Sequence, residues 1–356
     1  MSEVRAVRDD DRAAWDEIAS TSDDAWLSHS WRWNEQVEER VREGARRSLV
    51  ILRDGRLVGI VPQHLHTEGK GPVSRRVLHA NYWIGGGVAL ANTITGADRT
   101  ECFEAAMRAT HAQARRDGVA KILLTLPALS RRNLRCDDEA KRAIGPGFIE
   151  RSGRALVLRL FDRTEQDIWN GMEGRSRTKV NKADRAGVRV TQTSGIAAFD
   201  TFYALHLATY RRTHASAHTP AYFEAVLSDP AFHVFFAELD GRPIAAAIAA
   251  LYAGRALYFA SASLDEALHL GANNLLQWHV LRWLVRERVE AYELGLLPDP
   301  SDRGNQKERS IAGFLRSFGG DELPLYRGDY VYDRARDVMF SVARGILTRA
   351  RRRGSN

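Results

Sequence analysis

A strand, a tight turn and a second strand occur twice in this sequence, and the repetition limits how the chain can fold. Residues 48–66 read "SLVILRDGRLVGIVPQHLH", and residues 232–252 read "FHVFFAELDGRPIAAAIAALY". In both segments apolar residues flank an Asp-Gly pair. This pair is the strongest short-range signal for a β-hairpin, because the favoured two-residue turn requires positive φ at both positions. The sequence therefore predicts two hairpins of the same design.

The elements that follow each hairpin also come in the same order. Strand-like, helix-like and strand-like segments follow the first hairpin, the last two at 100–118 and 121–127. The same succession follows the second hairpin at 255–264, 273–289 and 291–298. A chance coincidence of common motifs is one explanation. The other, which we adopt, is a duplicated α/β unit with mixed (α+β) sheets.

The repeat predicts a domain boundary near Gly153, with a first domain at 1–153 and a second at 154–329. Residues 330–356 read as an amphipathic helix that we expect to pack back on the first domain. The apolar side of this helix is expected to contain Val338, Phe340, Val342, Ile346 and Leu347.

Composition excludes several classes of protein. With 356 residues, 44% of them hydrophobic, the chain can bury one large core or two ordinary ones. The apolar run at 243–254 is too short for a bilayer, and the polar start lacks a signal-peptide core. Cys102 and Cys136 form no CxxC pair, so no disulfide framework is implied. We therefore expect a cytoplasmic protein without integral membrane association.

The most basic segment lies at 174–188 and reads "GRSRTKVNKADRAGV". In a helix Arg175, Lys179 and Lys182 share one face, while Val180 and Ala183 face another side and can pack inward. Such neighbouring like charges repel each other, and an anionic ligand would turn that repulsion into attraction. With Arg177 these cations are candidates for phosphate binding; a solvated basic helix face is the alternative. The net charge of +7 itself concerns partners and solubility.

Other short motifs carry less chemistry. Gly85 to Gly87 lack the spacing of a phosphate loop, and they favour a turn where backbone passes close to a ligand or a neighbouring strand. Tyr82 and Trp83 beside them could line a pocket or pack in the core. His214 and His218 have the spacing of a zinc pair but lack the glutamate and a third ligand, so no metal is expected. No GxSxG elbow or reactive cysteine supports nucleophilic catalysis.

The segment 292–320 runs from a strand into a polar loop and then into a cationic stretch. Lys307, Arg309 and Arg316 surround the apolar Ile311 and Phe314. Loops at strand ends often carry function, although a surface loop followed by a capped helix has the same pattern.

Four of these segments resemble, in the same order, the Fem family of aminoacyltransferases and the related BioF2-like acetyltransferase domains. "HSWRWNE" resembles the early helix of the family and "RSRTKVNKADRAGVRV" its arginine-rich element. "LYFASAS…GANNLLQWHVLRWL…YELG" resembles the strand–helix–strand of the second domain, and "GFLRSFGG" the closing motif. The resemblance covers most of 25–330. It implies two tandem N-acetyltransferase-like (GNAT) domains, here without the coiled-coil arm of some members.

The resemblance also implies a function. Family members move an amino acid from aminoacyl-tRNA to an amine on a peptidoglycan precursor or a small peptide-like metabolite, with aminoacyl-tRNA as co-substrate and no further cofactor. Lys307 or Arg316 would stabilise the oxyanion, and Tyr258 or a phosphate of the substrate would relay the proton. The acceptor would be peptide-like or linked to a nucleotide. The residues expected to bind this acceptor or phosphates of the tRNA are Arg175, Arg177, Lys179, Lys182, Tyr82, Trp83, Tyr210, Arg211 and Asn274. The tRNA backbone would contact Arg344, Arg349, Arg351 and Arg352.

Two departures from the family pattern leave alternatives open. Leu315 stands where the closing motif usually has lysine, which is compatible with a changed acceptor or with a non-catalytic anion- or RNA-binding module. An acyl-CoA-dependent N-acyltransferase is the other alternative. The pyrophosphate-binding loop of such an enzyme has Arg or Gln at a fixed spacing before its small residues. "DEALHLGANN" has the small residues Gly271 and Ala272 but no Arg or Gln at that spacing.

Overall fold

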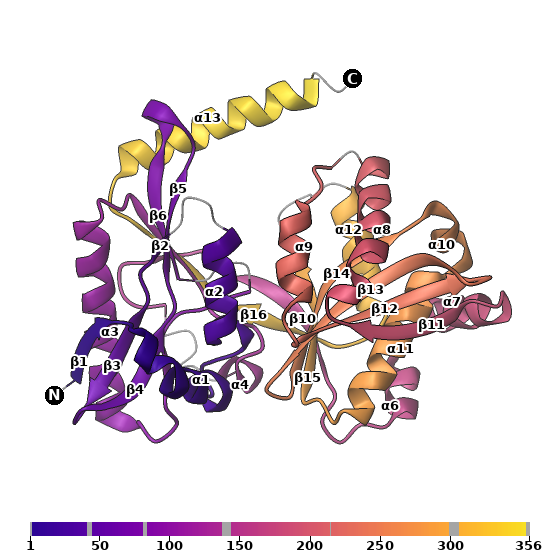
Figure 1. The fold of residues 1–356 in the computed structure, drawn as a ribbon, viewed down its shortest axis with the longest axis horizontal. Coiled ribbons are helices and arrows are strands. Elements are labelled where there is room, and N and C mark those ends of the chain that lie inside the picture. Colours follow the sequence, from indigo (N-terminus) through magenta and orange to yellow (C-terminus); the bar gives the residue numbers. More distant parts are fainter. Residues whose placement is uncertain are drawn as a thin grey trace. The chain divides into compact units, whose positions relative to one another are not determined.

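The computed structural model describes residues 2–40, 45–80, 84–136, 144–213, 215–298 and 306–353, without the side chains of 37–40, 307 and 347–353. Contacts divide the chain into two compact units (Figure 1). The first unit comprises Met1–Ser152 with Pro324–Asn356, and the second comprises Gly153–Leu323.

The first unit contains two sheets. One has the strand order β1-β3-β4-β7, and the other has the order β2-β5-β6-β8-β17-β9. The strands are β1 Ser2–Ala6, β2 Ala45–Arg46, β3 Leu49–Arg53, β4 Arg56–Val61, β5 His64–Glu68, β6 Arg75–Ala80, β7 Ala89–Leu90, β8 Lys121–Thr125, β9 Ile149–Glu150 and β17 Arg327–Val331. The helices are η1 Asp9–Asp11, α1 Arg12–Thr21, η2 Leu27–His29, α2 Trp31–Arg40, η3 Gly71–Val73, α3 Gly96–Arg116, α4 Arg131–Leu134 and α13 Arg334–Arg353.

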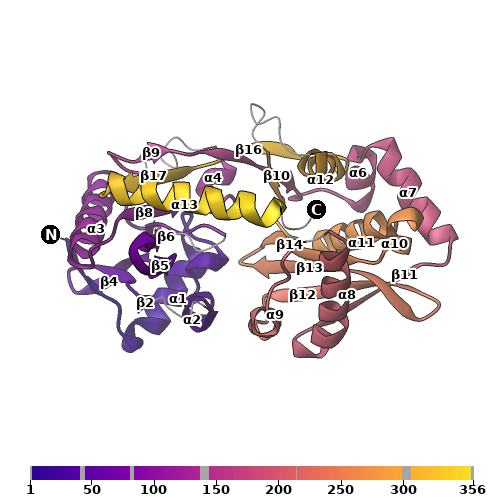
Figure 2. The same cartoon turned by 90° about the horizontal axis from the view of Figure 1, so that it is seen from above.

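The second unit is built on one sheet with the order β11-β12-β13-β14-β15-β10-β16. Figure 2 shows α8 and α9 on one side of the central strands and α11 with α6 and α7 on the other. The strands are β10 Gly153–Arg159, β11 Arg189–Ser194, β12 Phe232–Leu239, β13 Arg242–Tyr252, β14 Arg255–Ser263, β15 Ala291–Leu297 and β16 Asp321–Leu325. The helices are α6 Glu165–Gly171, α7 Gly174–Arg185, η4 Ile196–Ala198, α8 Phe199–Arg212, α9 Pro220–Leu227, α10 Asp265–Leu270, α11 Ala272–Arg286 and α12 Gln306–Arg316.

Both predicted hairpins form, with turns of the same geometry. Asp54 and Gly55 have φ of 50° and 73°, and Asp240 and Gly241 have φ of 52° and 75°. Positive φ at both turn positions matches the right-handed twist of the flanking strands. Each hairpin also shifts its register close to the turn, in β3–β4 and again in β12–β13. The shared irregularity supports duplication of one unit over a chance coincidence of motifs.

The parallel crossovers repeat as well. In the first unit β6 and β8 are parallel, with α3 between them in sequence. In the second unit β14 and β15 are parallel, with α11 between them. The prediction of tandem α/β units with mixed sheets is therefore confirmed, and the described residues contain no coiled-coil arm.

The glycine run of the first unit passes close to the end of β8. The amide of Gly86 donates to the carbonyl of Thr125 at 2.8 Å. A Cβ at Gly85 would lie 2.6 Å from the backbone nitrogen of Pro127, so only glycine fits there. Of the two alternatives that the sequence left open for this run, the structure has the close approach to a neighbouring strand. Tyr82 and Trp83 lie outside the described residues.

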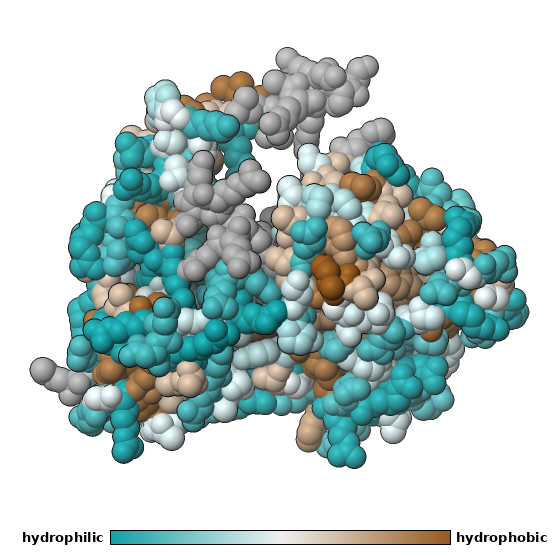
Figure 3. Space-filling view, in the orientation of Figure 1, coloured by the Kyte–Doolittle hydropathy of each residue, from teal (hydrophilic) through white to brown (hydrophobic). Residues whose placement is uncertain are grey.

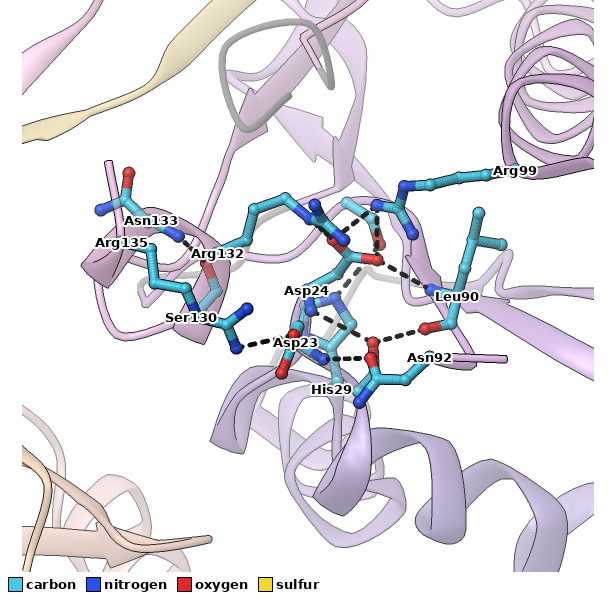
Figure 4. A network of polar contacts seen from close by, with 12 residues as sticks. Asp23, Asp24, His29, Leu90, Asn92, Arg99, Ser130, Arg132, Asn133 and Arg135 are labelled. Atoms are coloured by element: carbon cyan, nitrogen blue, oxygen red, sulfur yellow. Dashed lines mark hydrogen bonds and ion pairs between the residues drawn. The ribbon is translucent and has the colours of Figure 1, made fainter. Parts of the chain in front are cut away.

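A largely buried carboxylate, that of Asp24, fixes the segment after α1 to the rest of the first unit. Asp24 lies between the guanidinium groups of Arg99 and Arg132, which approach its carboxylate to 2.7 Å each (Figure 4). The amide of Leu90 in β7 donates to the same carboxylate at 3.2 Å. Because a buried charge is tolerated when it is paired and hydrogen-bonded, this network holds helices α3 and α4 and strand β7 around one point.

Helix α13 contacts the first unit through few side chains. Asp337 pairs with Arg75, and the Arg75 guanidinium lies 4.1 Å from the centre of the Phe340 ring. The expected apolar side of this helix does not pack as predicted, since Val338, Val342 and Ile346 are all exposed. No helix among the described residues is long and apolar enough to span a membrane.

Candidate functional site

The sheet of the second unit opens between two parallel strands. β14 and β15 pair over only three residues each, Arg255–Leu257 with Ala291–Glu293, although the strands run on to Ser263 and Leu297. The register between β13 and β14 also shifts at this point, next to Tyr258. Parallel strands that separate at their carboxyl ends leave a crevice, which is where ligands bind in open α/β sheets.

A cavity of about 630 Å³ lies at this opening. It is lined by the first turns of α7 and α11, the end of α8, strand β14, α10 and α12. Among the described residues that line it, four are cationic and none is a carboxylate. The cations are Arg175, Lys179, Arg212 and Arg309. An excess of positive charge in a partly enclosed space attracts anionic groups, and arginine binds phosphate with two oxygens at once.

Neighbouring groups orient two of these cations. The Arg175 guanidinium donates to the carbonyl of Gly313 at 3.0 Å and pairs with Glu173. The Arg212 guanidinium donates to the carbonyl of Ser263 at 2.6 Å and lies 3.3 Å from the Asp265 carboxylate. Neither carboxylate lines the cavity, but each offsets part of the charge of its arginine.

A chain of buried hydrogen bonds connects three of the helices around the cavity. The Asn274 amide donates to Ser176 Oγ at 3.0 Å, and Ser176 Oγ lies 2.6 Å from Ser317 Oγ. Ser317 Oγ donates in turn to the carbonyl of Phe314 at 2.6 Å. Each hydroxyl has a single proton, so Ser176 must donate to Ser317 and all donors point the same way. The chain ties α7 to α11 and α12.

We expect Ser176→Ala to lower the free energy of unfolding by about 2 kcal/mol, because it leaves the Asn274 amide and a Ser317 lone pair buried without partners. Urea denaturation followed by circular dichroism measures this loss. Thr178→Ala is the matched control on the same helix, since the exposed Thr178 hydroxyl only returns to the carbonyl of Gly174. A loss in Ser176→Ala no larger than in Thr178→Ala would contradict the chain.

Tyr258 reaches the cavity from the irregular part of β14 and is half-buried. Burial raises the pKa of the Tyr258 phenol, while hydrogen bonds with Ser261 and Gln277 lower it to a smaller extent. Behind it, the hydroxyl of the buried Tyr292 donates to Gln277 Oε1 at 3.1 Å. A phenol with a raised pKa stays protonated at neutral pH, so Tyr258 is suited to donate a hydrogen bond or a proton.

The cavity brings together some of the residues that the sequence singled out. Arg175, Lys179, Asn274 and Tyr258 all line it. Leu315 lines it too and is otherwise buried, so an apolar side chain occupies the position where the family motif has lysine. The side chain of Lys307 lies outside the described part of the structure, although its backbone belongs to the first turn of α12.

Three predicted cations lie elsewhere. Arg177 Nη1 donates to backbone carbonyls at the end of α6, at 2.5 Å to that of Met172. Lys182 Nζ donates to the carbonyl of His269 at the end of α10, at 2.7 Å. Cations stabilise the carbonyl ends of helices in this way. The Arg316 guanidinium pairs with Glu322 at 2.8 Å. None of the three side chains lines the cavity, so their roles in phosphate binding and catalysis stay predictions.

Helix α8 places Arg212 in the cavity lining, next in sequence to the predicted Tyr210 and Arg211. Tyr210 packs on the ring of His206, with ring centres 4.2 Å apart, and Arg211 is exposed; neither lines the cavity. Arg212 and Thr209 line it instead. Sequence reasoning missed Arg212, Ser176 and Ser317. The signal for Arg212 was its spacing of three residues from Thr209, which places both on one helix face.

The residues predicted to contact the tRNA backbone belong to α13 in the first unit. Arg344 is exposed there, and the side chains of Arg349, Arg351 and Arg352 lie outside the described part of the structure. The described residues contain no group of histidine, cysteine and carboxylate side chains that could hold a metal ion. His218 is exposed, and His214 lies outside the described residues.

Comparison with known proteins agrees with this geometry. Residues 172–305 match the family model of the acetyltransferase (GNAT) domain. No curated protein sequence matches the chain. A crystal structure of FemX is similar over 93% of this chain and 98% of its own, with 14% sequence identity and a TM-score of 0.70.

Two further solved structures have the same fold. The C-terminal domain of a putative lysylphosphatidylglycerol synthetase from Agrobacterium fabrum is 13% identical over 95% of this chain and 96% of its own, with a TM-score of 0.56. A tandem GNAT protein from the clavulanic acid biosynthesis pathway is 12% identical over 92% and 98%, with a TM-score of 0.51. Together with the domain match, these similarities show that the chain has a Fem-like GNAT fold of two tandem units. The match of 172–305 to the acetyltransferase domain supports acyl transfer as its class of reaction.

Proposed function

We propose that this protein transfers an aminoacyl group from aminoacyl-tRNA to an amine of a peptide-like acceptor. The observation that carries the proposal is the cavity beside β14, whose described lining has four cations and no carboxylate. A tRNA acceptor end brings phosphodiesters next to its reactive ester, and arginine and lysine side chains bind such phosphates.

The aminoacyl ester is already activated, so the main task of the protein is to position the amine and the ester. The acceptor amine attacks the ester carbonyl carbon, an amide bond forms, and the bond to the ribose oxygen breaks. The amine loses a proton and the ribose oxygen gains one. Tyr258, which burial keeps protonated, is assigned to donate to the leaving oxygen and to be reprotonated from the amine.

Positive charge near the developing oxyanion is the second requirement. The sequence interpretation gave this role to Arg316 or Lys307. Arg316 does not line the cavity, whereas Arg309 on the same helix does, so we assign the role to Arg309. Lys307 remains a candidate from the sequence.

The sequence ahead of α11 favours a tRNA donor over acyl-CoA. A pyrophosphate at a helix N-terminus must approach the first backbone amides of the helix. At Gly271, which precedes α11, a Cβ would lie 2.7 Å from the carbonyl oxygen of Lys179 in α7. Helix α7 therefore fills the space on the Cβ side of Gly271, while the first turn of α11 lines the cavity. An acyl-CoA loop would require Arg or Gln ahead of Gly271, and the absence of that residue favours the tRNA donor.

Transfer assays with two labelled donors test the proposal. One arm holds a pool of radiolabelled aminoacyl-tRNA and the other holds radiolabelled acyl-CoAs, each with a mixture of amino acids, short peptides and nucleotide-linked amines. We expect label to move from tRNA to a small amide product, and RNase treatment of the donor beforehand to abolish the transfer. Label arriving only from acyl-CoA, or no transfer in either arm while tRNA still binds, would contradict the proposal.

A further inference from the structure

Helix α13 exposes an apolar row that the fold does not cover. Val338, Val342 and Ile346 are 60%, 57% and 62% exposed, and Met339 beside them is 43% exposed. Their spacing of four residues places the three aliphatic side chains on one face of the helix. Figure 3 shows apolar side chains gathered on α13.

The orientation of this helix is the reverse of the usual one. A helix on the surface of a globular unit normally turns its apolar stripe toward the core and its charges toward water. Here the side that contacts the first unit carries Asp337 and Phe340, both of which meet Arg75. The apolar row is therefore free to meet a surface outside the unit.

The charge of the helix indicates what kind of surface that is. Between 334 and 353 the sequence has seven arginines and one acidic residue, Asp337. Asp337 is already paired with Arg75, so it offsets little of this charge. A basic helix with an exposed aliphatic row matches a surface that is anionic outside and apolar beneath.

We propose that α13 docks the protein on an anionic lipid bilayer, with its axis in the plane of the membrane surface. The aliphatic row enters the boundary between headgroups and acyl chains, and the arginines contact lipid phosphates. RNA would engage the arginines but leave Val338, Val342 and Ile346 in water. A second copy of the helix would cover the row but bring seven more arginines against the first seven.

Sedimentation of the full-length protein with lipid vesicles tests this proposal. We expect binding to vesicles of which about one third is phosphatidylglycerol, little binding to pure phosphatidylcholine, and weakening with added salt. Val342→Ser with Ile346→Ser should lower the partition coefficient by about ten-fold or more, because two aliphatic side chains no longer leave water. Circular dichroism checks that these exposed substitutions leave the fold intact.

Phe161→Ser is the matched control, since Phe161 in the second unit is an apolar side chain exposed to 70%. It should bind vesicles as the unchanged protein does. The proposal is overturned by the absence of binding to anionic vesicles or by an equal loss in Phe161→Ser. Self-association in vesicle-free solution that Val342→Ser/Ile346→Ser abolishes would assign the row to a second copy instead. Vesicle binding that free tRNA displaces, with no effect of the aliphatic substitutions, would assign the helix to RNA.

Discussion

Replacing Lys179 and Arg212 together by glutamine is expected to raise the Kd for aminoacyl-tRNA by about 10- to 100-fold at physiological salt, because two phosphate contacts are lost. Both side chains line the cavity, Lys179 from α7 and Arg212 from α8. The slope of log K against log salt should also fall in magnitude by about 1.5, which is the counterion release of two contacts. Filter binding over a salt series measures both quantities.

The matched control removes the same charge from the same two helices. Lys182→Gln with Arg211→Gln changes a side chain that donates to the carbonyl of His269 and one that is exposed outside the cavity lining. Its Kd should stay within about three-fold, since a distant exposed charge is screened by salt. Equal losses in the two double variants would mean that overall charge, and not the cavity, attracts the tRNA.

Gly271→Ala should lower the free energy of unfolding by about 3 to 4 kcal/mol, of which about 1 to 2 come from the left-handed backbone and the rest from overpacking. Gly271 has φ of 82°, and the added Cβ would lie 2.7 Å from the carbonyl oxygen of Lys179. Relief of this contact requires α7 to move away from α11, which would also disturb the cavity. Urea denaturation gives the stability change.

Gly241→Ala separates the two causes. Gly241 has φ of 75°, and a Cβ there would meet nothing within 4 Å. The loss should therefore be about 1 to 2 kcal/mol, the conformational part alone. If Gly271→Ala costs no more than Gly241→Ala, the added Cβ meets no resistance from α7, and the close packing of α7 on the start of α11 is contradicted.

Local signals in the sequence predicted the hairpins and the repeated order of elements, and the family resemblance implied the tandem GNAT fold. The Asp-Gly turns determine their own backbone angles, so both hairpins could be placed without tertiary information. Helix α7 followed from the spacing of Val180 and Ala183, which the structure buries. The repeated order of elements predicted a duplicated α/β unit but not which strands are parallel. For the hairpins and α7 the deciding physics acts over a few neighbouring residues.

The cavity could be predicted only in part, because its composition depends on which helix faces meet. Arg211 and Arg212 look alike in the sequence, and only the packing of α8 decides that Arg212 lines the cavity. Arg309 and Arg316 share a face of α12 but lie two turns, or about 10 Å, apart. Arg316 forms an ion pair with Glu322, which no pattern in the sequence predicted.

The two parallel strand pairs also suggest how readily each unit can be given a new ligand. In the second unit the crevice beside β14 is bordered by side chains, so trimming or exchanging them can reshape it. In the first unit the chain after β6 is held to the end of β8 by the Gly86 amide and by the contact of Gly85 with Pro127. The backbone of the glycine run closes the crevice between β6 and β8, so substitution of side chains alone does not open it. A designer seeking a second binding site would have to replace the whole glycine loop.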